Sequence, residues 1–340
     1  MSHRTRGIIR TAVAAALLGV ASMAQAQTEI QWWHSMGGAL GEKLNALATK
    51  FNASQSEYKV VPVFKGGYPE SMTATIAAYR AGNAPHIVQI FEVGTATMMA
   101  AKGAIVPVTK VMADAKEPFD PKAYLPAVAG YYTDSKGNML SFPFNSSTVV
   151  FYYNKDAFQK AGLNPDQAPK TWEDLAAYSK KIIASGAAKC GFTTGWPSWV
   201  HIENLSALHN VPIATKANGF GGIDIELKIN GDLQVRHIDN MAKWSKDGTF
   251  KYGGRESKAA PMFFSEECAM YMNSSAAREA VDANAKTFKV GVGMLPYYAD
   301  VKGAPQNSII GGATLWVLQG RPAADYKGVA KFFSYLSTPE

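Results

Sequence analysis

The run Ile87-Val88-Gln89-Ile90-Phe91, followed by Glu92, decides the fold class. An almost unbroken apolar run of this length is typical of a strand that is buried on both faces of a parallel sheet. Glu92 is the first charge after the run, so it is expected at the carboxyl end of that strand. In open α/β sheets, ligands bind in the crevice outside such strand ends, which makes Glu92 a candidate ligand contact.

The residues before this run alternate between strand and helix patterns. In order, they are a strand pattern at 29–33, a helical spacing of apolar residues over 40–51, a strand pattern at 58–63 and a helix pattern at 72–81. With the run at 87–91 these segments give the order βαβαβ, which predicts right-handed crossovers and a mostly parallel sheet flanked by helices.

A second strand-and-helix unit follows Pro143. Residues 149–153 are a predicted strand, and residues 154–161 are a predicted helix. The sequence Thr171-Trp172-Glu173-Asp174 is typical of a capping box, in which the N-cap Thr and the following Asp satisfy each other's backbone amides. Two such units indicate an α/β protein with two lobes.

Two later junctions also point to the crevice. Residues 268–272 are a predicted strand that runs through Ser274 into a predicted helix at 276–283, which leaves free amide groups near this serine. Serines in turns usually bond their own backbone, so the residues alone leave the role of Ser274 open. Further on, Gly311-Gly312 follows two isoleucines, and the lack of side chains there lets the backbone approach a ligand closely.

The first 26 residues have the three parts of a secretory signal peptide. The arginines before residue 11 form a basic region, residues 11–20 form an apolar core, and Ala24-Gln25-Ala26 is a cleavage site. The apolar core is shorter than the roughly 20 residues that span a bilayer, which argues against a membrane anchor. We therefore expect a soluble periplasmic protein that begins at Gln27.

The rest of the 340-residue chain is long for a single core and typical of two lobes. With 47% hydrophobic and 18% charged residues, the chain has the composition of a globular protein. Its formal net charge of +7 includes the arginines of the signal region, and it lacks the basic runs that track nucleic acid. Nucleic acid is therefore not an expected partner.

Cys190 and Cys268 are the two cysteines of the chain. In an oxidising compartment such a pair usually closes into a disulfide, and neither CxxC spacing nor a neighbouring His supports a reactive or metal-binding pair. A bridge over this separation stabilises the fold by roughly 4 kcal/mol in the chain-entropy model.

Several motifs together resemble the extracellular solute-binding proteins of ABC importers. They are Gly82-Asn83-Ala84-Pro85, Tyr152-Tyr153-Asn154-Lys155-Asp156-Ala157-Phe158, Ala161-Gly162-Leu163 and Pro169-Lys170-Thr171-Trp172. Within that family, the segments 33–36, 94–100, 143–148 and 304–313 are similar to the periplasmic branch that binds sn-glycerol 3-phosphate. The resemblance covers residues from about 30 to 340. It implies a type II fold of two α/β lobes, with glycerol 3-phosphate or a glycerophosphodiester such as glycerophosphocholine held in the cleft between them.

The same resemblance implies six ligand contacts. Tyr68 would contact the phosphate, Glu92 would accept hydrogen bonds from glycerol hydroxyls, and Trp196 would lie over the glycerol backbone. The other three contacts are the hydroxyls of Ser147 and Ser274 and the backbone amide of Gly312. Family members continue beyond the position of Glu340 with a helical segment, which the resemblance implies supplies another ligand Tyr and a phosphate-pairing Arg.

The residues alone leave other interpretations open for the same positions. Glu92 is equally consistent with a surface carboxylate, and a Trp such as Trp196 is most often a core residue. The neighbours Gly195 and Pro197 favour a loop for Trp196, and the Gly-Gly pair before Tyr68 favours a loop tip.

We expect lobe 1 to comprise residues 27–143 and 305–340, and lobe 2 residues 144–304. The sequence has no GxSxG, HExxH or GxxxxGK[ST] motif, so we expect no catalytic residue, no metal and no cofactor. The resemblance implies a monomer whose partners are the small-molecule ligand and the membrane permease subunits of an ABC importer. One alternative is a sugar or oligosaccharide receptor. Another is a secreted glycoside- or phosphodiester-processing enzyme, which needs a second acid opposite Glu92.

Overall fold

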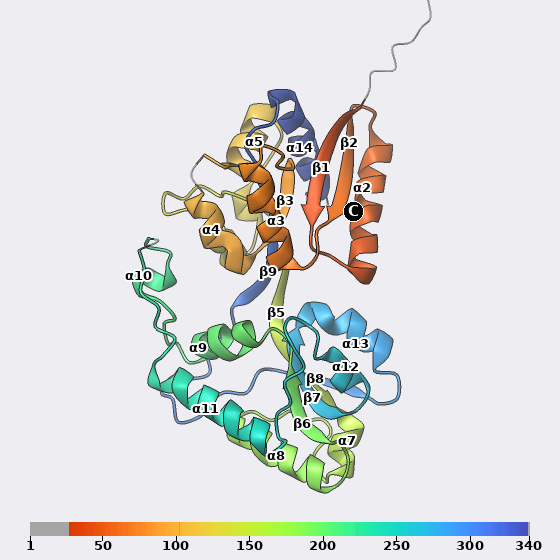
Figure 1. Ribbon diagram of the computed structural model, residues 1–340, viewed down its shortest axis with the longest axis vertical. Coiled ribbons are helices and arrows are strands. Elements are labelled where there is room, and N and C mark those ends of the chain that lie inside the picture. Colours follow the sequence, from red (N-terminus) through yellow and green to blue (C-terminus); the bar gives the residue numbers. More distant parts are fainter. Residues whose placement is uncertain (1–26, 102, 223, 339–340) are drawn as a thin grey trace, which may run out of the picture.

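Two lobes, each a β-sheet covered by helices, lie one above the other in the computed structural model (Figure 1). The structure describes residues 27–338 except 102 and 223. The predicted signal peptide, residues 1–26, therefore lies outside the described residues. The two-lobed α/β organisation expected from the sequence is confirmed.

Lobe 1 contains a sheet in the order β2-β1-β3-β9, continued by the first half of β5. Its strands are β1 Thr28–His34, β2 Tyr58–Phe64, β3 Ile87–Phe91, β5 Phe142–Asn154 and β9 Ile310–Leu318, and a short β4, Ile105–Val106, also pairs with β9. The strands predicted at 29–33, 58–63 and 87–91 are confirmed.

Lobe 2 continues the same sheet path through the second half of β5. β7 and β8 pair with β5, and β6 pairs with β7. The bounds are β6 Cys190–Thr194, β7 Cys268–Ser274 and β8 Val290–Gly293.

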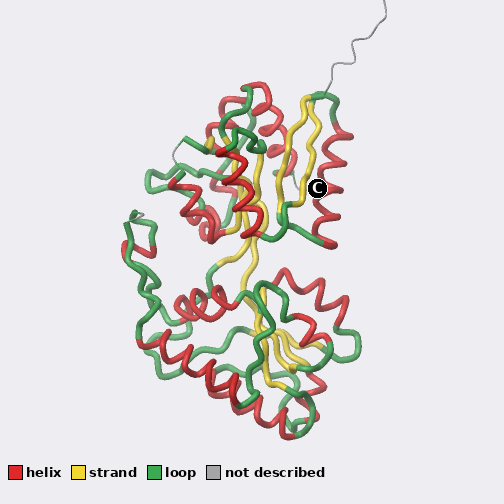
Figure 2. The backbone as a smooth tube through the Cα atoms, in the orientation of Figure 1, coloured by secondary structure: helices red, strands yellow, loops and turns green. Residues whose placement is uncertain are grey.

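The sheets are mixed, so the prediction of a mostly parallel sheet in each lobe is wrong. Only β1 with β2, β1 with β3, and β6 with β7 pair in parallel among the described strands. The reason is that β5 carries the chain out of lobe 1 while β9 carries it back, so the two crossing strands pair antiparallel with each other. Figure 2 shows strand segments passing between the two lobes. The strands β3 and β7, which run toward the junction between the lobes, are in turn antiparallel to β9 and β5 respectively.

The predicted lobe boundary at residues 143 and 144 falls inside the continuous strand β5. Residues 142–148 of β5 pair with β9, whereas residues 149–154 pair with β7 and β8. The exact division of the chain between the lobes stays a prediction.

Helices cover the faces of both sheets (Figure 1). In lobe 1 they are α2 Gly38–Ser54, α3 Tyr68–Arg80, α4 Thr95–Ala100, α5 Val108–Ala115, α6 Pro126–Tyr131 and α14 Ala323–Leu336, with 3₁₀ turns at Glu92–Gly94 and Pro121–Ala123. In lobe 2 they are α7 Lys155–Lys160, α8 Trp172–Ala184, α9 Leu205–Leu208, α10 Thr215–Asn218, α11 Asp232–Lys246, α12 Ala260–Phe264 and α13 Arg278–Asn284, with a π-helix at Trp199–Asn204 and a 3₁₀ turn at Ser275–Ala277.

Helix α8 begins at the predicted capping box. The hydroxyl of Thr171 accepts from the amide of Asp174 at 3.0 Å, and the Asp174 carboxylate accepts from the amide of Thr171 at 3.1 Å. Trp172 and Leu175 of this helix are fully buried in the core of lobe 2. The separate core of lobe 1 is built around Trp32 and Phe332.

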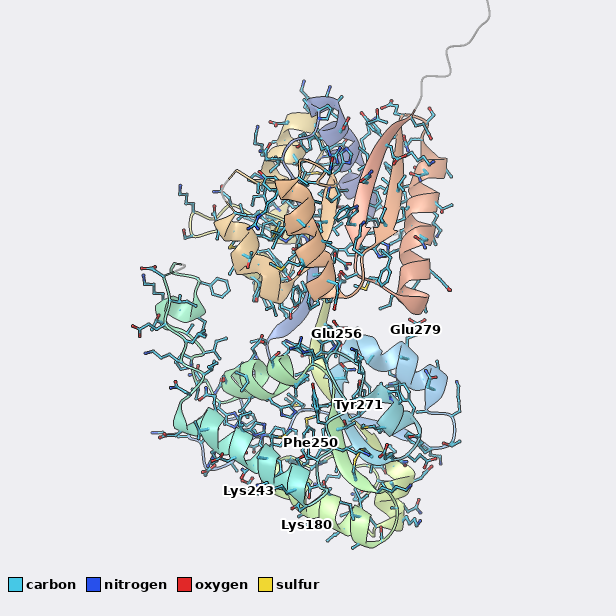
Figure 3. The ribbon with its side chains drawn as sticks, viewed as in Figure 1. Lys180, Lys243, Phe250, Glu256, Tyr271 and Glu279 are labelled. Carbon is cyan, nitrogen blue, oxygen red and sulfur yellow. A yellow bond between two sulfur atoms is a disulfide. The ribbon has the colours of Figure 1, made fainter. Side chains whose placement is uncertain are left out.

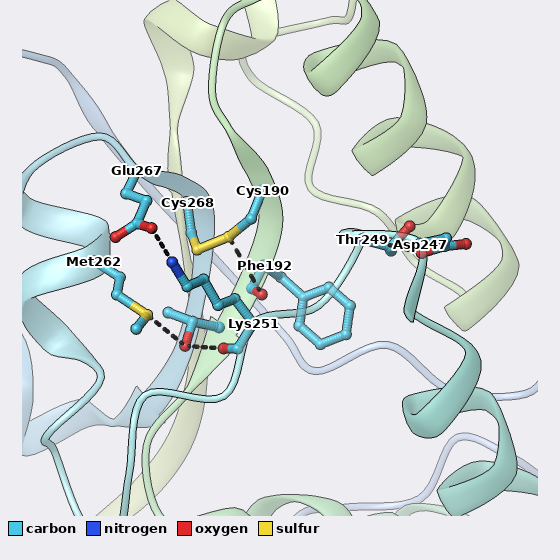
Figure 4. Close-up of a disulfide and its surroundings, with 9 residues drawn as sticks. Cys190, Phe192, Asp247, Thr249, Lys251, Met262, Glu267 and Cys268 are labelled. Carbon is cyan, nitrogen blue, oxygen red and sulfur yellow. Dashed lines mark hydrogen bonds and ion pairs between the residues drawn. A yellow bond between two sulfur atoms is a disulfide. The ribbon is translucent and has the colours of Figure 1, made fainter. Parts of the chain in front are cut away.

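The predicted disulfide between Cys190 and Cys268 is present (Figure 4). The two residues are directly paired neighbours on the parallel strands β6 and β7, with their Cα atoms 4.6 Å apart. Both residues are buried, and the ion pair between Lys251 and Glu267 lies beside them. The bridge therefore fastens one edge of the lobe 2 sheet.

Candidate ligand-binding cleft

A cavity of about 520 Å³ lies between the two lobes. All six residues predicted as ligand contacts line it: Tyr68, Glu92, Ser147, Trp196, Ser274 and Gly312. Their convergence follows from the strand directions, because β3, β6 and β7 end at the cavity, β9 begins there, and β5 passes it midway. The structure thus brings together residues from position 68 to position 312 by placing the right strand ends at one junction.

Glu92 follows β3 and is almost completely buried, with 7% of its surface exposed. Its Oε2 atom accepts a hydrogen bond from the backbone amide of Gly312 at 3.1 Å. Burial raises the pKa of the Glu92 carboxyl to about 7, and the nearby charge of Glu203 adds to this rise while the Gly312 amide opposes it. The interpretation of Glu92 as a surface carboxylate is therefore wrong.

Gly312 occupies a position in β9 that only glycine fits. Its φ of +124° lies in the region that L side chains rarely adopt. A Cβ at this position would lie 2.8 Å from the Cα of Ser146 and would also collide with the carbonyl oxygen of Asn145. The close approach of β5 and β9 at the cavity therefore depends on this glycine.

The sequence suggested that Tyr68 lies at the tip of a loop, but it is the first residue of α3. The helix begins four residues earlier than predicted because Pro69, which follows Tyr68, is favourable in a first helical turn. The ring of Tyr68 stacks on Phe91 with centroids 5.2 Å apart, and its hydroxyl accepts from Asn145 Nδ2 at 3.2 Å. Burial raises the pKa of Tyr68 to about 12, so the hydroxyl remains a neutral donor.

Trp196 lies in the loop after β6, as predicted, and adopts a φ of +46°. Its backbone amide donates to the carbonyl oxygen of Glu256 at 2.9 Å, which holds the loop in place. The Trp196 ring belongs to lobe 2 and lies 6.3 Å from the ring of Tyr68 in lobe 1. The two aromatic rings therefore face the cavity from opposite lobes.

The hydroxyl groups of the two predicted serines differ in their surroundings. Ser147 lies on β5 opposite Gly311, at the wall of the cavity. Ser274 ends β7, and its hydroxyl accepts from the amide of Ala276 at 3.1 Å. A turn role and a site role for Ser274 are thus both compatible with the structure, since its hydroxyl hydrogen stays free to donate.

Sequence reasoning missed several polar groups of the cavity wall. Asn145 links the site together, since its Oδ1 accepts from Gln89 Nε2 at 2.8 Å while its Nδ2 donates to Tyr68. Among the described residues, the hydroxyl of Ser35 and the indole N–H of Trp199 are buried without a hydrogen-bond partner. Asn145 and Ser35 stand in the quoted motifs at 143–148 and 33–36, and these motifs were the available signal. Ser35 directly follows β1, whereas Asn145 lies within β5.

Acidic side chains outnumber basic ones around the cavity. Its described lining contains the carboxylates of Glu92 and Glu256 and one basic side chain, Lys43. In the described part of the chain, no group of His, Cys, Asp and Glu side chains is arranged to hold a metal ion. None of the helices described is both long and apolar enough to cross a membrane.

Comparison with known proteins gives the same family along nearly the whole chain. Residues 37–340 match the model of the bacterial extracellular solute-binding protein family. The chain is 53% identical to the sn-glycerol-3-phosphate-binding periplasmic protein UgpB of Pectobacterium atrosepticum over 98% of this chain and 74% of that protein. It is 52% identical to the protein of the same name from Escherichia coli, over 98% of this chain and 76% of the relative.

Solved structures share the fold at lower identity. UgpB from Mycobacterium tuberculosis in complex with glycerophosphocholine superposes with a TM-score of 0.76 at 19% identity, over 92% of this chain and 75% of that one. The GacH receptor of Streptomyces glaucescens, solved unliganded and with acarbose, gives a TM-score of 0.75 at 20% identity, over 92% and 76% of the two chains. At this level of identity the likeness establishes the type II periplasmic binding fold and nothing about the ligand.

Proposed function

Because this chain belongs to the bacterial extracellular solute-binding proteins, we propose that it captures sn-glycerol 3-phosphate and glycerophosphodiesters such as glycerophosphocholine for an ABC importer. It is a periplasmic binding component and not an enzyme, as its relatives are named for binding. The observation that carries the proposed ligand is the convergence of Tyr68, Glu92, Ser147, Trp196, Ser274 and Gly312 on one cavity.

Ligand capture uses the two strands that join the lobes. β5 and β9 form the hinge. They pair with each other beside lobe 1, and β5 then continues into the sheet of lobe 2, where it pairs with β7. A ligand that enters the open cleft contacts both lobes at once and so favours the closed arrangement. The closed form is the one that the permease subunits recognise.

Glu92 holds the glycerol end of the ligand. Its carboxylate accepts hydrogen bonds from glycerol hydroxyls, and the Gly312 amide fixes the orientation of that carboxylate from the other side. Placing the acid at the end remote from the phosphate avoids repulsion between like charges.

Neutral donors hold the phosphate. The hydroxyls of Tyr68, Ser147 and Ser274 line the cavity on both lobes, and hydrogen bonds to a charged group contribute roughly 1.5–3 kcal/mol each. The number of such donors therefore decides the affinity. Trp196 offers an aromatic face for the C–H surface of glycerol or for a choline cation.

Export through a cleaved signal peptide at residues 1–26 is part of the same proposal, and it is supported by the relatives, which are named as periplasmic proteins. The division into lobe 1, residues 27–143 and 305–340, and lobe 2, residues 144–304, also belongs to it.

A neutral sugar is the second candidate, because aromatic rings and carboxylates with little positive charge are also what a sugar site offers. Calorimetric titration with sn-glycerol 3-phosphate, glycerophosphocholine and maltose separates the two. We expect saturable heat from the two glycerophosphate compounds and none from maltose. Heat from maltose alone would reject the proposed ligand.

A further inference from the structure

Lobe 2 presents two carboxylates to lobe 1 across the cleft, those of Glu256 and Glu279. Figure 3 shows both at the edge of lobe 2 that faces the other lobe. Neither belongs to the six predicted ligand contacts, and they reach lobe 1 at two different helices.

Glu279 forms an ion pair with Lys43 that joins the lobes. The Nζ atom of Lys43 on α2 lies 3.1 Å from Oε1 and 3.0 Å from Oε2 of Glu279 on α13. The two residues are 236 positions apart, and their side chains are 65% and 50% exposed. This contact can exist only while the lobes are together, because α2 and α13 lie on opposite sides of the hinge.

Glu256 approaches lobe 1 at the start of α3. A Cβ added to Gly67, the N-cap residue of that helix, would lie 2.7 Å from Glu256 Oε1. Glu256 adopts a φ of +53°, a backbone conformation that is unfavourable for a glutamate, and its carbonyl oxygen accepts from the Trp196 amide. A carboxylate near a helix N-terminus is favourable, but the Glu70 carboxylate of α3 lies as close to Gly67 as that of Glu256. The two negative groups oppose each other there, so the case for a closed arrangement rests on Lys43 and Glu279.

We infer that Lys43 and Glu279 are positioning residues for ligand binding, which raise affinity by stabilising the closed lobes without contacting the ligand. The inference rests on the proposed function. The measured affinity of a hinged receptor is its intrinsic affinity scaled by the fraction of molecules in the binding-competent state. An exposed ion pair contributes little, which predicts roughly a two- to fivefold effect on Kd.

The competing role for Lys43 is direct contact with the phosphate, since it is the one basic side chain among the described residues that line the cavity. The two roles differ in their response to exchange of the charges. An interlobe ion pair survives when both charges are reversed, whereas a glutamate at position 43 would repel an anionic ligand whatever stands at position 279.

The test is a double-mutant cycle of Lys43→Glu, Glu279→Lys and the doubly exchanged variant, titrated with sn-glycerol 3-phosphate and glycerophosphocholine. Each single substitution should weaken binding at least two- to fivefold, and the double exchange should restore Kd to within twofold. Lys50→Glu, an exposed charge reversal on the same helix, is the matched control and should leave Kd unchanged. Failure of the double exchange to restore binding would overturn the inference.

X-ray scattering of the ligand-free proteins provides a readout that is independent of the ligand. The single variants should have a larger radius of gyration than the wild type, and the double exchange should return it. Radii that are equal in all variants would also reject the role in closure. If the wild type binds neither glycerophosphate compound, the proposed ligand fails, whereas the scattering still decides whether Lys43 and Glu279 hold the lobes together.

Discussion

The carboxylate of Glu92 accepts a hydrogen bond from the backbone amide of Gly312 at 3.1 Å, so two residues that were predicted as separate ligand contacts also contact each other. Gly312 lies on β9, one of the two strands that cross between the lobes, and Glu92 directly follows β3, the neighbour of β9 in the sheet. A ligand hydroxyl that binds Glu92 therefore meets an acceptor that is already oriented. The contributions of the two residues to binding are coupled and will not add.

Replacing Glu92 with Gln should stabilise the fold at neutral pH while weakening ligand binding. The pKa of Glu92 is about 7 in the folded protein against an ordinary value of 4.5. Its contribution to stability is therefore fully present below pH 4.5 and is lost as the pH rises through 7, because the folded state must then bury a charge. Thermal unfolding at about pH 5 and about pH 8 should show a higher midpoint for the variant, mainly at the higher pH.

Calorimetry supplies the second half of that prediction. Glu92→Gln should bind sn-glycerol 3-phosphate about tenfold more weakly or worse, since one charged acceptor of hydroxyl protons is lost. The control is Glu42→Gln on the exposed face of α2, which should leave the affinity unchanged. A variant with unaltered affinity would remove Glu92 from the ligand site.

Gly312→Ala should destabilise the fold by about 3 kcal/mol, because it combines an unfavourable φ with a collision against the backbone of β5. Gly320→Ala is a matched control, since Gly320 has a φ of +99° and open space around its Cα. It should cost only about 1 kcal/mol, the strain of the left-handed region alone. Urea unfolding of the two variants measures the difference, and equal losses would contradict the role assigned to close packing at Gly312.

Local patterns predicted the strands of lobe 1 and the capping box of α8 because each depends on residues that are near one another in sequence. The mixed sheet was not predictable in this way. The direction of a strand relative to its neighbour depends on the lobe from which the chain arrives. The residues of β9 carry no local pattern that indicates its return from lobe 2.

The candidate site shows the same limit. Composition and spacing identified Glu92 as a crevice residue, but Tyr68, Ser147 and Trp196 were found only through the family resemblance. Asn145 was missed because an Asn beside two serines has many local explanations, and its bonds to Gln89 and Tyr68 exist only when β3, β5 and α3 are assembled.

Tyr68→Phe tests the phosphate contact with little disturbance of the fold. The substitution keeps the ring stacked on Phe91 and removes only the hydroxyl, which accepts from Asn145. If the hydroxyl donates to phosphate, affinity for sn-glycerol 3-phosphate should fall by about tenfold or more, as expected for a bond to a charged group. Tyr79→Phe is the control, because the Tyr79 hydroxyl lies outside the cavity, and it should leave the titration unchanged.

Removing the Cys190–Cys268 bridge should lower the free energy of unfolding by about 4 kcal/mol and leave ligand binding intact, since neither cysteine lines the cavity. Urea unfolding of the double Cys→Ala variant measures the loss. Dithiothreitol should lower the free energy of unfolding of the wild type toward that of the variant, and it should not change the stability of the variant. Impaired binding by a folded variant would show that the β6–β7 edge positions the loop of Trp196.

A buried histidine network in lobe 2 should make the protein less stable in mild acid. Burial lowers the pKa of His201 to about 3 and that of His237 well below its ordinary value of 6.5. The Tyr298 hydroxyl accepts from Asn240 and lies 3.0 Å from His237 Nδ1, and His237 Nε2 lies 2.9 Å from His201 Nδ1. The arrangement that also gives the Tyr298 hydroxyl hydrogen an acceptor is the one in which Tyr298 donates to His237 and His237 donates to His201, with both imidazoles neutral.

The sign of the effect follows from the unfolded chain, which binds protons at its histidines below about pH 6.5 while the folded protein does not. Each of these residues should therefore reduce the free energy of unfolding by about 1 kcal/mol between about pH 7.5 and about pH 5.5, opposite in sign to Glu92. In His201→Leu, the free energy of unfolding should fall by about 1 kcal/mol less than in the wild type between these two pH values, as measured by urea unfolding. Tyr298→Phe breaks the same network but leaves both imidazoles buried, and burial is the main cause of their lowered pKa values, so it should lower stability equally at both pH values. A wild-type pH dependence in His201→Leu would mean that His201 is not kept neutral by the fold.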